Sequence, residues 1–388
     1  MIHSPAALAP IRSSITDVGF NFLEYATTPG ASEDAVPFVS PLSLFFCLSL
    51  FANDPRFNAA QAQILTMFGA DGKSIDMLNQ AAQEILNRYS SAPEVRRTLR
   101  ALQSSGTPYV FEIANAIWAK EFDDQFKALV ESTYDASTFP LTPRTTVDEI
   151  NDWVSTQTKG TIPTILKEMP QDVTTIFLNA IYFKGTWQIA FKKKSTSRKP
   201  FQLADGNSIS VPMMFKRHKF KFVANGELGQ VVALPYVYDE ARQAPLHAMV
   251  ILPPPSTDIH EFIKTLPAQL RTIDGKMKFT KIDLSLPRFQ AEATNELLEF
   301  LADQGITSVR SSTSNEELTQ VVQKVFVKVD EEGTVAAAVT AAIRQTRSFK
   351  SYPKMNCNRP FIFVLRNPDS GVASFIGLVS EQDQFSSA

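Results

Sequence analysis

The chain has 388 residues, of which 44% are hydrophobic and 20% are charged, and its formal net charge is −2. A chain of this length buries roughly three-quarters of its unfolded surface, so its core needs no disulfide or structural metal. The near-neutral charge gives no reason to expect nucleic acid or an anionic membrane as the main partner.

The first third of the chain is predicted to be mainly helical. Four apolar residues near the start recur at helical spacing: Ile11, Ile15, Val18 and Phe22. Residues 61–68 continue this pattern after a turn at 53–55. The uncharged run 35–52 is a little short for a membrane span, and its prolines and serines favour a buried helix with an entry turn.

Strands are predicted for most of the remainder. Residues 109–118 are rich in β-forming side chains, residues 147–155 fit an amphipathic helix, and residues 173–183 are apolar on both faces, as in a central strand. Further short strands are expected at 231–234, 248–252, 282–286, 321–329, 360–365 and 373–379, with a helical turn or two at 296–301. Helices first and strands later, without repeats or a linker, predict one α+β domain over residues 1–388 with large antiparallel sheets.

One segment, residues 333–343, does not fit this pattern. It reads Gly-Thr-Val-Ala-Ala-Ala-Val-Thr-Ala-Ala-Ile, without a charge or a large side chain, and it runs into Arg344, Arg347 and Lys350. An ordinary helix and a buried packing segment are both open, because alanine has the highest helix propensity. The segment lacks a helical apolar stripe, however, and fits a loop or a strand equally well, which is what a conformational switch needs.

Seven motifs between Phe38 and Val379, in the same order, resemble those of the serpin family of serine protease inhibitors. They lie at 38–43 (Phe-Val-Ser-Pro-Leu-Ser), 150–160, 179–187 (Asn-Ala-Ile-Tyr-Phe-Lys-Gly-Thr-Trp), 234–236, 286–289 (Leu-Pro-Arg-Phe), 328–338 (Lys-Val-Asp-Glu-Glu-Gly-Thr-Val-Ala-Ala-Ala) and 358–377. The resemblance implies the serpin fold, with three β-sheets, about nine helices and an exposed reactive loop at about 331–353. It implies no cofactor.

In that family a target protease cleaves the reactive loop and becomes an acyl-enzyme, and the loop then inserts into the main sheet. The resemblance assigns the loop hinge to six residues: Glu331, Gly333, Thr334, Ala336, Ala337 and Ala338. The scissile bond usually lies sixteen residues beyond the hinge glutamate, which implies Arg347–Ser348 as the reactive bond. Arginine fits a trypsin-like pocket, whose buried carboxylate pairs with guanidinium. The expected partner is therefore a trypsin-like serine protease in a covalent complex. The protein itself is expected to be a monomer.

The composition of the loop fits insertion. Residues 333–346 would span about 45 Å as a strand, and alternate side chains would face the core. The residues expected on the core side are small, so they fit between existing strands without overpacking: Thr334, Ala336, Ala338, Thr340 and Ala342. Arg344 would also face the core near the end of the new strand, and it offers a second basic site whose cleavage would shorten the inserting segment.

The resemblance also indicates where the main sheet parts. Ser40 and Asn179 match the family's shutter, whereas the usual His is Gln323 and a usual Asn is Val36. An amide both donates and accepts, so a neutral hydrogen-bond network remains available there. Trp187 ends the strand-to-turn motif at the breach, below the point where the loop inserts.

Nothing in the sequence indicates an enzyme. It has four histidines, no Gly-x-Ser-x-Gly elbow and no metal-binding motif. The alternative to inhibition is a non-inhibitory serpin that acts as a carrier, chaperone or structural protein, which the small hinge residues disfavour. Two basic clusters fit either a heparin-like polyanion or an ordinary solvated face: Arg96, Arg97 and Arg100, and Lys192–Lys194 with Lys216, Arg217, His218, Lys219 and Lys221.

Two further features bear on the compartment. The two cysteines, Cys47 and Cys357, are expected to be buried free thiols, because a secreted disulfide scaffold would carry many more. The opening residues lack the basic start and apolar block of a signal peptide. The sequence leaves open whether the protein is extracellular or cytoplasmic.

Overall fold

The computed structural model describes residues 7–30, 35–89, 109–169, 173–238, 243–307, 321–334 and 351–386. Within these ranges the chain forms ten α-helices and three β-sheets, in agreement with the predicted α+β class. The helices are α1 (Ala9–Thr27), α2 (Pro41–Ala52), α3 (Asn58–Met67), α4 (Asp76–Tyr89), α6 (Asp124–Tyr134), α7 (Val147–Gln157), α8 (Ile259–Leu270), α9 (Ile273–Lys276), α10 (Leu298–Asp303) and α11 (Asp383–Ser386).

The largest sheet has nine strands and holds most of the second half of the chain. Its order is β1 (Phe38–Val39), β15 (Ala373–Val379), β14 (Phe361–Arg366), β8 (His247–Leu252), β7 (Gly229–Pro235), β6 (Ser208–Asn225), β9 (Lys278–Pro287) and β13 (Lys354–Asn356), with β5 (Ser197–Gln202) beside β6. The four-stranded sheet has the order β12 (Gly333–Thr334), β4 (Thr175–Thr186), β2 (Val110–Ala119) and β3 (Ala136–Pro140). The third sheet is the antiparallel pair β10 (Phe289–Glu296) and β11 (Val322–Val329).

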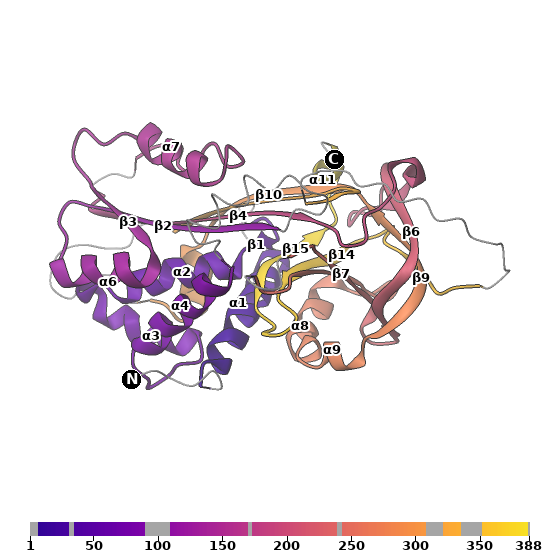
Figure 1. Ribbon diagram of the computed structural model, residues 1–388, viewed down its shortest axis with the longest axis horizontal. Helices are drawn as coiled ribbons and strands as arrows, with labels where there is room; N and C mark the ends of the chain where they lie inside the picture. The colour runs from indigo at the N-terminus through magenta and orange to yellow at the C-terminus, as the bar shows by residue number, and fades with distance from the viewer. Residues whose placement is uncertain are drawn as a thin grey trace.

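The elements form an elongated molecule. Figure 1 shows α2, α3, α4 and α6 below the layer of β2, β3 and β4 at one end, with α7 on the opposite face of that layer. The long strands β6 and β9 lie at the other end. Strand β4 therefore runs from the helices at one end of the molecule toward the nine-stranded sheet at the other.

The apolar segments recognised near the N-terminus form the expected helices. Ile11, Ile15 and the other two residues of the α1 stripe are buried. Helix α2 begins after Ser40, whose hydroxyl accepts a hydrogen bond from the Ser43 backbone N–H at 3.2 Å and so caps the first turn. Nearly every residue of α2 is buried. No helix within the described ranges has the length and the apolar character needed to cross a membrane.

Strand β4 is buried on both faces, as its sequence predicted. On one face Phe177 packs edge-on against Phe51 of α2, with 5.6 Å between the ring centroids. On the other face Leu178 lies in a separate apolar cluster with Ile150 and Val154 of α7. Helix α7 therefore covers the sheet through the apolar side that its sequence pattern predicted.

One edge of β4 is only briefly paired. Along its other edge β4 pairs with β2 over its length, from Val110 opposite Lys184 to Ala119 opposite Thr175. On the free edge, the only ladder partner among the described residues is the two-residue strand β12. Strand β11 contacts both β4 and β12, but it forms its own ladder with β10 alone within the described ranges. A further strand could therefore pair with the free edge of β4, on the side where β11 lies.

Candidate functional site

The chain reverses direction in a tight turn between β11 and β12. The Asp330 N–H donates to the Gly333 carbonyl at 2.9 Å, and the Asp330 carboxylate accepts from the backbone N–H groups of Glu332 at 2.8 Å and Gly333 at 3.2 Å. Strand β12 then runs antiparallel to β4, with Gly333 opposite Thr186. The turn therefore places the two residues of β12 at one end of the otherwise unpaired edge of β4 within the described ranges.

The backbone at Gly333 accepts only glycine. Its φ of +148° lies in a region that L side chains rarely adopt. A Cβ added there would lie 2.1 Å from the carbonyl oxygen of Gly185 on β4. The backbone angle and the close approach of the two strands are thus two separate reasons for glycine at this position.

Two backbone N–H groups and one indole N–H bind the turn to the segment that follows β4. The Trp187 indole Nε1–H donates to the Asp330 carbonyl at 3.0 Å, and the Trp187 N–H donates to the Glu332 carbonyl at 2.9 Å. The Phe191 N–H donates to the Glu331 carbonyl at 2.8 Å. Trp187 is itself buried and stacks on Tyr236 with 4.3 Å between the ring centroids. Three consecutive carbonyl groups of the turn are thus fixed by one rigid segment.

The Glu331 side chain lies buried in the clamp as a paired charge. It is 1% exposed. Its carboxylate receives two hydrogen bonds from the Arg288 guanidinium, Nε to Oε2 at 2.8 Å and Nη2 to Oε1 at 2.5 Å, and a third from the Thr196 hydroxyl. Burial raises the pKa of Glu331, but the hydrogen bonds from Arg288 and Thr196 outweigh it, so the pKa is held below its usual value. The geometry is the bidentate fork that arginine forms with carboxylates.

A second ion pair closes the rim of the hinge. The Lys193 ammonium contacts the Glu332 carboxylate at 2.7 Å, and the Lys193 side chain is 68% exposed. Hydrogen bonding to Glu332 raises the pKa of Lys193. Because the Lys193 end of this pair lies largely in water, the pair is screened more than the pair between Glu331 and Arg288.

The shutter residues form two separate hydrogen-bonded pairs. Gln323 accepts from the Ser40 backbone N–H at 2.8 Å and donates to the Ser40 carbonyl at 2.9 Å. Asn179 donates instead to Asn115 Oδ1 at 2.8 Å, and Asn179 Oδ1 is buried without a partner among the described residues. The amide of Gln323 therefore keeps a neutral bridge between β11 and the entry to α2. Among the described residues no hydrogen bond joins that bridge to Asn179, although the resemblance implied one network.

Asn295 is a shutter residue that the sequence did not single out. It lies opposite Gln323 on β10 and is fully buried. Its Oδ1 accepts from the Val36 N–H at 3.0 Å, and its Nδ2 donates to the Phe38 carbonyl at 2.7 Å. A side chain on β10 thus holds the backbone at Val36. The only indication in the sequence was that Asn295 shares its alternating positions with the apolar residues Phe289, Ala291 and Ala293.

The remaining predicted residues fall into two groups. Arg347–Ser348, Ala336–Ala338 and the basic cluster at 96–100 lie outside the described residues. The second basic cluster is described, and three of its members already bind groups of this chain: Lys193 pairs with Glu332, Arg217 pairs with Asp283 and Lys216 donates to a backbone carbonyl. The two ion pairs neutralise part of the charge that a polyanion would meet, and heparin binding stays a prediction.

The hinge partners Arg288 and Thr196 were also missed. Arg288 lies in the motif Leu-Pro-Arg-Phe at 286–289, so a signal was present: a glutamate assigned to a buried hinge needs a cation nearby. Elsewhere in the described ranges, no group of His, Cys, Asp and Glu side chains could hold a metal ion. Both cysteines are free, and burial raises the pKa of each thiol to about 12.

Comparison with known proteins agrees with this arrangement. The family model described as Serpin (serine protease inhibitor) matches residues 13–382. Serpin B6 of Pongo abelii is 30% identical over 92% of this chain and 96% of its own length. The leukocyte elastase inhibitor of Equus caballus is 30% identical over 88% of this chain and 92% of its own length.

Solved structures show the same fold. The thermophilic serpin tengpin in its native state has a TM-score of 0.79 and 25% identity, and the match covers 98% of this chain and 95% of tengpin. An Arabidopsis serpin in its native stressed conformation has a TM-score of 0.78 and 24% identity, covering 96% of this chain and 98% of that one. These similarities confirm the expected fold and the resemblance drawn from the sequence motifs.

Proposed function

The chain belongs to the serpin family, and we propose that it inhibits trypsin-like serine proteases through cleavage at Arg347–Ser348. The observation that carries this proposal is the pairing of β12, where the proposed reactive loop starts, with the C-terminal end of β4. The two strands are antiparallel, and this edge of β4 has no other ladder partner among the described residues. The chain that follows is small and uncharged up to Ile343. A loop that starts in register with an open edge is prepared to continue as a strand.

The proposed reaction uses the chemistry of the protease. Its catalytic serine attacks the carbonyl carbon of Arg347, the peptide bond to Ser348 breaks, and Ser348 leaves with a new amino terminus. The Arg347 carbonyl is then held as an ester on the protease. Cleavage also frees the upstream part of the loop, which remains attached to the body at β12. The chain itself supplies only the substrate bond and the sheet edge.

Insertion competes with hydrolysis of that ester. Residues 335–346 would extend β12 along β4, and their backbone groups would pair with the facing edges of β4 and β11. At a net gain of about 1 kcal/mol per hydrogen bond, a strand of this length gains on the order of 10 kcal/mol. That gain is comparable with the whole stability of a typical domain, so it is large enough to displace a tethered protease and distort its active site.

The class of protease follows from the residue before the bond. The pocket of a trypsin-like protease carries a buried carboxylate that pairs with a guanidinium, whereas the pocket of elastase is small. One relative is named a leukocyte elastase inhibitor. Arg347 does not suit that small pocket, so we assign this chain to trypsin-like targets despite the similarity.

Mixing the protein with trypsin and separating the products on a denaturing gel tests the proposal. We expect a covalent band at the summed mass of the two proteins, and we expect Arg347→Ala to lose it. A second variant, Arg344→Ala, is the matched control and should keep the band. Cleavage of the loop without any covalent band would instead support the non-inhibitory alternative, a serpin that acts as a carrier, chaperone or structural protein.

A further inference from the structure

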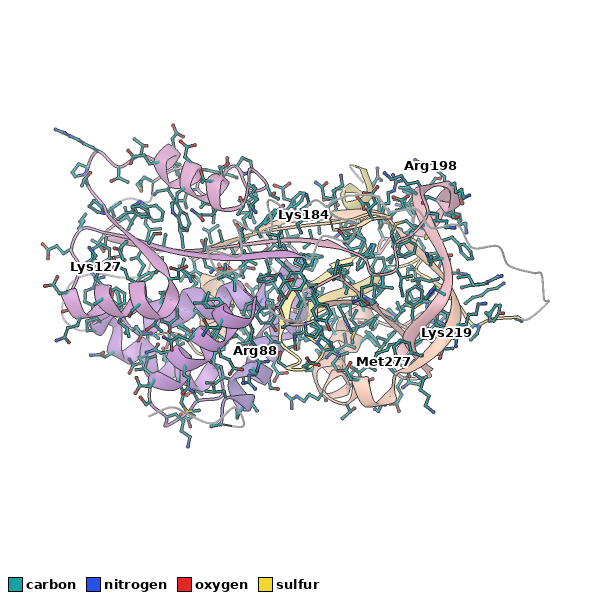
Figure 2. All side chains as sticks on the ribbon, viewed as in Figure 1. Arg88, Lys127, Lys184, Arg198, Lys219 and Met277 are labelled. Atoms are coloured by element: carbon teal, nitrogen blue, oxygen red, sulfur yellow. The ribbon has the colours of Figure 1, made fainter. Side chains whose placement is uncertain are left out.

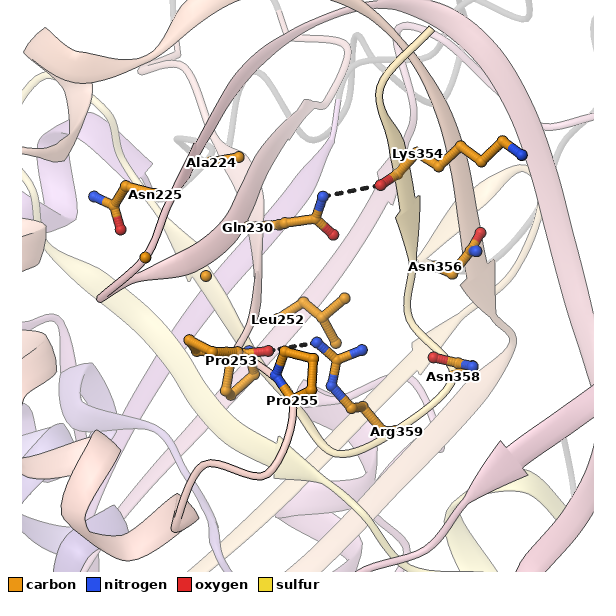
Figure 3. A pocket seen from close by; sticks show the side chains of 13 residues that line it. Ala224, Asn225, Gln230, Leu252, Pro253, Pro255, Lys354, Asn356, Asn358 and Arg359 are labelled. Carbon is orange, nitrogen blue, oxygen red and sulfur yellow. Dashed lines mark hydrogen bonds between the residues drawn. The ribbon is translucent and has the colours of Figure 1, made fainter. Parts of the chain in front are cut away.

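A cavity opens on the nine-stranded sheet and shares no residue with the hinge or the shutter. Its volume is about 640 Å³, within the range of small-molecule sites. It lies between the turn that joins β6 to β7, the three prolines after β8, and β13 with the residues that follow it (Figure 3). Inhibition as proposed above does not use this cavity, so any ligand it holds is a separate property of the protein.

The charge of the lining favours an anion. Lys354 and Arg359 line the cavity, and none of the described lining residues is acidic. Four side-chain amides complete the polar part of the wall: Asn225, Gln230, Asn356 and Asn358. Cations and amides without a carboxylate among them are an environment in which an anionic group would be stabilised.

The Arg359 guanidinium has N–H groups that do not donate to any other group in the described part of the chain. Its Nη2 donates to the Pro253 carbonyl at 2.6 Å, while its Nε is buried and has no partner among the described residues. Guanidinium offers five N–H donors in a planar fork that matches a carboxylate. A single bond to a carbonyl leaves most of that fork unused. The structure therefore presents a half-buried guanidinium beside a cavity, and no carboxylate in the described part of the chain pairs with it.

The apolar part of the wall and the directions of the side chains narrow the class of ligand. Leu252 and the prolines at 253–255 form a rigid apolar surface next to Arg359 (Figure 3). The Lys354 ammonium points away from the prolines in the same view, so of the two cations in the described lining only Arg359 lies against this surface. One fixed cation next to an apolar wall fits a single negative charge on a flat ring better than a polyphosphate.

The cavity is held in shape by bonds across it. The Gln230 side chain donates to the Lys354 carbonyl at 2.9 Å and so ties β7 to β13 (Figure 3). The turn after β6 is fixed by Asn225, whose Oδ1 accepts from the Leu228 N–H at 2.5 Å. At Gly229 a Cβ would lie 2.2 Å from the Leu252 carbonyl oxygen, so the glycine lets the two walls approach. A site formed before binding loses little free energy in ordering its side chains.

From these observations we infer that the cavity between β7, the proline turn and β13 is a binding site for a small aromatic carboxylate, whose carboxylate pairs with Arg359 and whose ring packs on Leu252 and the prolines. The same ligand would contact β13, a three-residue edge strand that pairs only with β9 in the described part of the chain. Binding should therefore slow amide exchange at 354–359.

Isothermal titration calorimetry of the intact chain with naphthoate tests the site. We expect a dissociation constant on the order of 100 µM, as for a fragment of this size. Neutral naphthamide and inorganic phosphate should each bind at least about tenfold more weakly, because each lacks one of the two parts that the site recognises. If either one binds as tightly as naphthoate, or if naphthoate gives no heat, the inference is wrong.

Three variants locate the binding. Arg359→Gln should weaken naphthoate binding at least about tenfold. Because Arg359 also holds the proline turn, Asn356→Asp serves as a second test: this exposed side chain keeps its size and brings a negative charge to the cavity, so it should weaken binding without lowering the unfolding midpoint. Lys127→Gln, at the opposite end of the molecule (Figure 2), should bind as the unchanged protein does. Unchanged affinity in Asn356→Asp, or equal weakening in Lys127→Gln, would overturn the assignment.

Discussion

Replacing Arg288 with methionine removes the charge that balances Glu331 in the hinge. The change keeps most of the side-chain volume but leaves a carboxylate that is 1% exposed without its bidentate partner. Removing one partner of a fully buried ion pair costs about 3–5 kcal/mol. The Arg288 side chain is 29% exposed, so water can replace part of the interaction. We therefore expect Arg288→Met to lower the free energy of unfolding by about 2–3 kcal/mol near neutral pH.

The loss should shrink in acid, and the sign follows from the pKa of Glu331. Burial raises this pKa, but the bonds from Arg288 and Thr196 outweigh burial and leave it lowered. A lowered carboxyl pKa stabilises the fold above the unfolded value of about 4.3, and this stability is lost as pH falls through the folded pKa. In Arg288→Met the hydrogen bonds from Arg288 are lost, so burial raises the pKa of Glu331 above its unfolded value. Protonation of Glu331 in acid therefore stabilises the variant relative to its state at neutral pH, whereas it destabilises the unchanged protein. The difference between the two proteins should therefore shrink as pH falls through the raised pKa of the variant, and it should be smallest below the lowered pKa of the unchanged protein.

Urea unfolding followed by tryptophan fluorescence measures the effect, with refolding from urea verified for each protein so that the midpoints report equilibrium free energies. Lys193→Met is the matched control: it removes the partner of Glu332 but takes away a cation that lies largely in water, so it should shift the midpoint by less than half as much as Arg288→Met. The double variant Glu331→Gln with Arg288→Met should recover part of the loss, since it no longer buries an unpaired charge. Equal shifts in Arg288→Met and Lys193→Met, or a loss that does not change with pH, would refute the reasoning.

Three further changes test other parts of the structure. Gly333→Ala should lower the unfolding midpoint and slow formation of the covalent complex in stopped reactions with trypsin, because its Cβ would collide with the Gly185 carbonyl; an unchanged rate would contradict the close approach. Asn295→Leu should cost about 2 kcal/mol in urea unfolding, since it leaves the Val36 N–H and the Phe38 carbonyl unpaired, and a neutral result would contradict that role. A protease that cuts only after Arg344 should be released without a covalent band, because the inserting segment is three residues shorter.

The elements that the sequence predicted well are those whose apolar pattern is complete. The α1 stripe, the two-sided strand β4 and the alternating strand β11 all lie where their periodicity placed them. The predicted strand at 282–286 covers only part of β9, because its first four residues are exposed or half-buried and two of them are lysines, Lys278 and Lys281. Strand β6 went unrecognised for the same reason: more than half of its side chains are exposed or half-buried, and pairing with β7 and β9 holds it in the sheet.

The candidate site was predictable in position but not in detail. The motifs assigned Ser40 and Gln323 to one region and Trp187 to the breach, and the structure joins Ser40 to Gln323 and Trp187 to Asp330 by hydrogen bonds. The bond from Asn179 to Asn115 and the pair between Glu331 and Arg288 join residues far apart in the chain. Spacing within one segment carries no information on such contacts, because they depend on how the sheets and the hinge turn pack together.

Cutting the bond between Arg347 and Ser348 and then measuring the thermal unfolding temperature tests the account most directly. If the segment beyond β12 joins the free edge of β4, the cleaved protein should unfold at a temperature well above that of the intact one, and amide exchange along residues 175–184 should slow. An unchanged unfolding temperature, with that edge still exchanging freely, would contradict the claim that this chain traps proteases by inserting its loop.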